Sequence, residues 1–64
     1  MLRIIKNNAL NYEYHFSSTS KIEIEKLAVK KLKEIRKLHG KIQKNEMKFD
    51  ENQKMYYKTI FVQY

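Results

Sequence analysis

Positive charge is the feature of this chain with the clearest chemical meaning, and it is concentrated in one short stretch. KLAVKKLKEIRKLHGK, residues 26–41, carries seven Lys or Arg side chains and one Glu, while the whole 64-residue chain has a net charge of +7. At 3.6 residues per turn, most of these side chains recur along one stripe of a helix. Lysine is a point charge without base-reading geometry. The stripe therefore suits phosphate backbones, or an acidic protein surface, with little sequence preference.

The stripe predicts a set of phosphate contacts. Like charges four residues apart each cost roughly 0.2–0.5 kcal/mol in an isolated helix, and only Glu34 lies within the stretch to offset them. We expect a small domain to keep this repulsion for a polyanionic partner, because neutralising phosphates releases counterions. The alternative is a solvated face whose early glutamates and late lysines complement the helix dipole. The residues expected to bind nucleic acid are Lys26, Lys30, Lys33, Lys37 and Lys41, with Arg36 and Lys44 flanking them.

Catalytic and metal chemistry have little support in the sequence. Glu13 and His15 are two residues apart on a predicted strand, so they share a face and could pair, which is weak support for acid–base catalysis. The hydroxyl side chains of residues 17–20 precede a helix, where such residues cap the backbone. His39 closes that helix, neither histidine has a further ligand at metal spacing, and there is no cysteine. We therefore expect no enzyme activity, metal or cofactor.

The amino-terminal residues are predicted to form a hairpin. Residues 10–16 alternate apolar and polar side chains without a fault, which is typical of a strand with one buried face. Residues 2–5 predict its partner strand. Asn7 and Asn8 between them favour a turn because asparagine tolerates a positive φ.

One helix follows. Ser20 and Glu23 match a capping box, in which each side chain accepts a hydrogen bond from the other residue's backbone amide. The helix is expected over residues 21–39, and Gly40 stands where helices commonly end in a left-handed conformation. Six apolar residues fall on one helix face: Ile24, Leu27, Ala28, Leu32, Ile35 and Leu38.

The period returns to two after Gly40, which predicts strands around 47–49 and over 55–64 with a turn at 50–53. The chain is thus predicted to be a single α+β domain, residues 1–64, in ββαββ order, with one amphipathic helix on one face of a four-stranded sheet. The residues expected beneath the helix are Ile4, Tyr12, Tyr14, Phe16, Phe49, Ile60 and Val62. Those expected on the open face are Arg3, Ile5, Glu13, His15, Lys48, Tyr57, Thr59 and Phe61.

The open face has more apolar surface than water alone would favour. Its aromatic side chains could stack on unpaired bases or could form a homodimer interface. The second, subsidiary surface predicted for ligand contact consists of Arg3, Lys48, Tyr57 and Phe61.

Two functions of different classes follow. The first is a small non-enzymatic protein that binds DNA or RNA through lysine–phosphate contacts. The alternative is an interaction module, such as a small phage or mobile-element inhibitor or adaptor, that docks on an acidic protein surface and dimerises through its sheet. No segment resembles a signal peptide or a membrane span, and a cysteine-free basic chain suits a reducing cytosol. We expect a cytoplasmic protein with no membrane partner.

Overall fold

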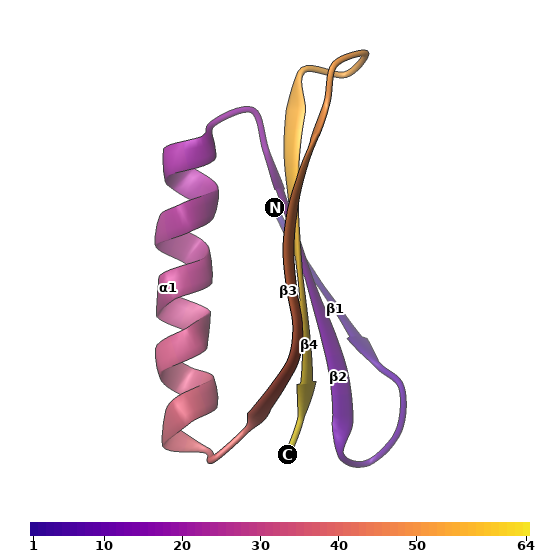
Figure 1. Ribbon diagram of the computed structural model, residues 1–64, viewed down its shortest axis with the longest axis vertical. Helices are drawn as coiled ribbons and strands as arrows, with labels where there is room; N and C mark the ends of the chain where they lie inside the picture. The colour runs from indigo at the N-terminus through magenta and orange to yellow at the C-terminus, as the bar shows by residue number, and fades with distance from the viewer.

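The computed structural model describes residues 1–64 and confirms the α+β fold in ββαββ order (Figure 1). The four strands form one antiparallel sheet in the order β1-β2-β4-β3, and the helix lies along one face of it. No helix is both long and apolar enough to cross a membrane. The elements are β1 (Leu2–Lys6), β2 (Asn11–Ser18), α1 (Lys21–Lys37), β3 (Lys41–Asp50) and β4 (Met55–Gln63).

The first hairpin has the predicted asparagine turn. The Asn8 Oδ1 accepts hydrogen bonds from the backbone amides of Leu10 at 2.9 Å and Asn11 at 3.0 Å, so one side chain closes the loop. The register pairs Ile4 with Tyr14. The second strand runs to Ser18, two residues beyond the predicted end.

The start of the helix differs in one detail from a simple capping box. The Ser20 hydroxyl accepts from the Glu23 amide at 3.3 Å, as predicted. The Ser20 amide, however, donates to the Ser18 hydroxyl at 3.0 Å, and that hydroxyl donates to the Glu23 carboxylate at 3.1 Å. Ser18 is buried and lies between the two capping partners. It therefore joins the end of β2 to the first turn of α1.

The end of the helix corrects the role assigned to Gly40. The left-handed residue is His39, with φ 59°, and the helix ends at Lys37 rather than at His39. The His39 amide donates to the Arg36 carbonyl at 3.0 Å and the Gly40 amide to the Ile35 carbonyl at 2.9 Å, which is a Schellman motif. Gly40 is required for space instead. A Cβ placed there would lie 2.6 Å from Ile35 and 2.9 Å from Val62.

The core is a narrow seam between the helix and the two central strands. The helix contacts β2 and β4, and Ile24, Ala28 and Ile35 are its buried residues. On the sheet side, Phe16 and Ile60 are almost fully enclosed. The other core members are Tyr14 and Val62, with Tyr12, Leu27, Leu32, Met47, Tyr56 and Tyr64 packed around them.

Both edge strands lie outside the cover that the helix provides. Two side chains expected beneath the helix, Ile4 on β1 and Phe49 on β3, are 52% and 46% exposed. A helix is about 10–12 Å wide, whereas four strands at ~4.8 Å spacing span roughly 19 Å. One helix therefore covers about two strands. Leu38, expected on the buried helix face, is 66% exposed because the helix has already ended there.

Adjacent substitutions at the helix end should change stability in opposite directions. Gly40→Ala should destabilise the fold by about 1–3 kcal/mol, because its Cβ overpacks the seam. His39→Gly should stabilise it by up to about 1 kcal/mol, because glycine adopts positive φ without strain. Urea unfolding of both variants at pH 8 measures these effects. Stabilisation by Gly40→Ala would contradict the close approach of Gly40 to Ile35 and Val62.

Candidate nucleic-acid interface

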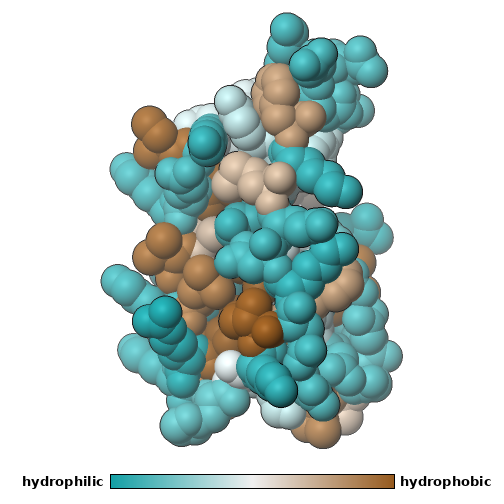
Figure 2. Space-filling model, viewed as in Figure 1, coloured by the Kyte–Doolittle hydropathy of each residue, from teal (hydrophilic) through white to brown (hydrophobic).

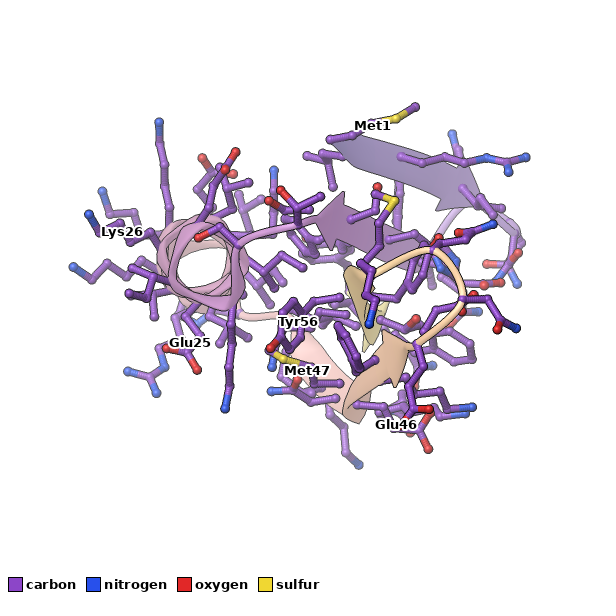
Figure 3. The ribbon with its side chains drawn as sticks, turned by 90° about the horizontal axis from the view of Figure 1, so that it is seen from above. Met1, Glu25, Lys26, Glu46, Met47 and Tyr56 are labelled. Atoms are coloured by element: carbon purple, nitrogen blue, oxygen red, sulfur yellow. The ribbon has the colours of Figure 1, made fainter.

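The lysines of the helix face away from the sheet. Lys26, Lys30, Lys33 and Lys37 lie on the side of α1 opposite its buried residues, and all four are exposed. Figure 3, viewed along the helix, shows the labelled Lys26 side chain pointing outward. At 1.5 Å per residue, the four lysines span about 16 Å of helix. We call these four residues the lysine stripe.

No carboxylate forms an ion pair with the lysine stripe. The ion pairs of the chain join His15 to Glu13, Lys31 to Glu34 and Lys44 to Glu46. All of them use cations outside the stripe, so its charges are left free for a partner.

The pKa of Glu34 is lowered by positive charges on the helix. The hydrogen bond from Lys31, 2.8 Å long, and the charge of Lys31 lower the pKa of Glu34. Lys30 and Lys37 add weaker attraction at longer range. Lys31 itself points toward the sheet, with its Nζ 5.1 Å from the centre of the Tyr14 ring. Lys31 is thus engaged inside the molecule, unlike its neighbours on the stripe.

Two residues expected to belong with the lysine stripe lie elsewhere. Lys41 is the first residue of β3, opposite Gln63, because the chain turns back at His39. Lys44 pairs in register with Phe61 on the open face of the sheet, and its Nζ lies 5.3 Å from the Phe61 ring centre. Arg36 is exposed in the last helical turn, beside the stripe as predicted.

The open sheet face is organised around His15. Its Nε2 lies 3.0 Å from the Glu13 carboxylate and its Nδ1 lies 3.4 Å from the Thr59 hydroxyl. The Phe61 ring meets the imidazole edge-on, with the two ring centres 6.5 Å apart. A hydrogen bond from Asn7, 2.7 Å long, and then the one from His15 lower the pKa of Glu13.

This hydroxyl–imidazole–carboxylate order occurs in hydrolases, where it acts beside an oxyanion site. Acyl transfer also needs free amides aimed at the developing oxyanion. Thr59 and His15 face each other across β2 and β4, the two central strands, whose backbone groups pair within the sheet. No group of three or more His, Asp or Glu side chains is placed to hold a metal ion.

The residues of the predicted second surface do lie together on the open face. Arg3 pairs with His15, and Lys48 pairs with Tyr57. Two shallow recesses flank His15, one of about 310 Å³ that includes Arg3 and one of about 200 Å³ that includes Lys48 and Phe61. Tyr57 and Phe61 are half-buried among these polar neighbours. This face is therefore less apolar than its composition suggested.

A tyrosine cluster beside the end of the helix was not predicted from the sequence. The Tyr12 ring stacks parallel to Tyr14 at 6.3 Å and meets Tyr64 edge-on at 5.5 Å. The hydroxyls of Tyr14 and Tyr64 lie 2.9 Å apart. The cluster lines an open apolar recess of about 470 Å³ together with Ala9 and Leu38. The two-residue period of the last strand could have identified Tyr64, because it places Tyr64 on the same face as Val62.

Comparisons of the chain with protein-family models, with curated proteins and with solved structures give no match.

Tyr64 should make stability depend on strongly alkaline pH. Burial, and then the hydrogen bond with Tyr14, raise the pKa of Tyr64 to about 12 from an ordinary value of 10.0. The folded phenol keeps its proton where the unfolded one loses it. Its contribution is therefore complete below pH 10 and is lost as the pH rises through about 12. Tyr64→Phe should show a smaller loss of unfolding free energy between pH 9 and pH 11 than wild type in urea titrations. An equal loss in both proteins would contradict this environment.

Proposed function

We propose that this protein binds nucleic acid through the lysine stripe, without enzymatic activity and with little sequence preference. The observation that carries the proposal is four lysines on the outer helix face, none of them paired with a carboxylate. A regular row of point charges matches a regular polyanion better than it matches a single compact anion. Arg36 lies beside the row and adds a fifth positive side chain.

The elements behind the lysine stripe support this role. The opposite face of the same helix holds the buried core residues Ile24 and Ile35. Both helix ends are tied to the rest of the fold, through Ser18 at the start and Gly40 at the end. The backbone that carries the lysine stripe is therefore held in place by the fold, while the exposed lysine side chains keep their rotamer freedom until a partner binds.

A second candidate is docking on an acidic protein surface, and it has one observation in its favour. Ile22 and Val29, which are 67% and 51% exposed, flank Lys26 on the outer helix face. Exposed apolar side chains beside positive charges suit a protein partner, whereas a phosphate backbone offers no apolar surface to contact them. The two candidates therefore differ in their dependence on Ile22 and Val29.

Binding to nucleic acid should depend steeply on salt and on the lysine stripe. Four lysine–phosphate contacts predict a log–log salt slope of about −3 to −4 on duplex DNA. Lys30→Glu/Lys37→Glu should flatten this slope and weaken binding to all sequences about equally. Fluorescence anisotropy with labelled duplex DNA, single-stranded DNA and RNA at several salt concentrations provides the measurement.

The matched control is Lys6→Glu/Lys54→Glu, which makes the same change in net charge away from the lysine stripe. It should reduce affinity far less than the stripe variant. Ile22→Ser/Val29→Ser should leave nucleic-acid affinity unchanged. If none of the three nucleic acids is bound at low salt, the proposal is wrong and docking on an acidic protein surface is favoured instead. Equal losses in the stripe variant and its control would place binding elsewhere.

A further inference from the structure

One edge of the sheet is long, unpaired and free of covering elements. β3 is the longest strand, with ten residues, and it lies at the end of the strand order beside β4. The opposite edge, β1, has five residues. An unpaired edge presents a row of backbone donors and acceptors to any second strand. β3 contains no proline that would interrupt such pairing.

The part of β3 that could pair has natural limits. The register shifts at Gln43, where an extra residue bulges the strand. Bulges bend a strand and end regular pairing. At the other end, the chain enters its turn after Asp50, whose side chain accepts from the amides of Asn52 and Gln53. The regular segment therefore runs over residues 44–50, and its centre is Met47.

The charge pattern of residues 44–50 is complementary to that of a second, antiparallel copy of the same segment. The side chains of β3 on the open face of the sheet alternate in charge along the strand: Lys44, Glu46, Lys48 and Asp50. We propose that two copies of the chain pair antiparallel through β3, with the two-fold axis at Met47. In that register Lys44 of each copy faces Asp50 of the other, and Glu46 faces Lys48. Opposite charges directly across an antiparallel pair are stabilising.

The helix side of β3 is also suited to burial. Within residues 44–50, Phe49 is 46% exposed and Met47 is half-buried, because the helix covers the central strands. Figure 2 shows apolar surface on this side of the molecule, between the helix and β3. Figure 3 shows Met47 directed toward the helix side and Glu46 directed away from it. Pairing about Met47 would bring the two Met47 side chains together and set each Phe49 beside Asn45 of the other copy on the helix side, with the charges on the open face.

The opposite edge lacks these properties, which makes β3 the specific choice. Edge lysines normally prevent strand pairing, but each lysine in residues 44–50 would meet an acid. On β1 the charged residues are Arg3 and Lys6, and the strand contains no acid to oppose them. The open sheet face is also a weaker candidate for dimerisation, since Tyr57 and Phe61 are half-buried there.

The paired assembly would be an eight-stranded sheet with both helices on the same side. A two-fold axis perpendicular to the sheet at Met47 keeps the two helices on one face. Since each helix lies over β2 and β4, four strand spacings of ~4.8 Å put the helix axes about 19 Å apart. Both lysine stripes then face the same direction. The inference stands on β3 alone and does not require the proposed function.

Charge exchange tests the register directly. Glu46→Lys should place two lysines opposite each other, and Lys48→Glu two glutamates, so each variant alone should dimerise at least about tenfold more weakly than wild type. An equimolar mixture should dimerise, because the lysine introduced in one variant then faces the glutamate introduced in the other. The double variant Glu46→Lys/Lys48→Glu should also recover. Sedimentation equilibrium from 10 μM to 1 mM, with circular dichroism to verify folding, measures these states.

A cysteine on the proposed axis gives a second test. The chain has no cysteine, so Met47→Cys introduces the only thiol, and mild oxidation should cross-link it to the same residue of the second copy. Asn45→Cys is the matched control. It lies on the same side of the same strand and is exposed, but its copies would be more than 10 Å apart, beyond disulfide reach. A monomeric wild type at 1 mM, single charge variants that dimerise like wild type, or equal cross-linking of both cysteine variants would each overturn the inference.

Discussion

The contact between one face of α1 and the two central strands is the constraint on which the rest of the structure depends. Ile24, Ala28 and Ile35 pack against Phe16 and its neighbours on β2 and β4, and no disulfide adds to this seam. Because the seam is only about two strands wide, its position decides which surfaces remain free. The outer helix face, the open sheet face and both sheet edges are all consequences of that one contact.

The sequence predicted the elements well because each had a local cause. Alternation specified β2, the capping residues specified the start of α1, and the apolar period specified which helix face is buried. The open-face positions of Arg3 and Lys48 also followed from alternation alone. The lysine stripe was predictable for the same reason, since a helix period places side chains without reference to anything beyond the helix.

The errors arose where the answer depends on contacts between distant residues. Lys41 and Lys44 continue the helix period in sequence, but the chain reverses at His39 and the bulge at Gln43 then shifts the side-chain pattern. Phe49 has the alternation of a buried residue, but its exposure depends on strand order. Nothing local specifies that β3 is an edge. The role of Gly40 likewise depends on Val62, a residue more than twenty positions away.

The strand order has a consequence for folding kinetics. β4 is the last strand in the chain, yet it lies inside the sheet between β2 and β3. Tyr12 pairs with Val62, fifty residues later, so the loop entropy of most of the chain must be lost before the core forms. The helix packs on both β2 and β4, so its buried face is only partly covered until β4 is inserted. Folding should therefore be slower than in helical domains of equal length, with a transition state that already contains β4.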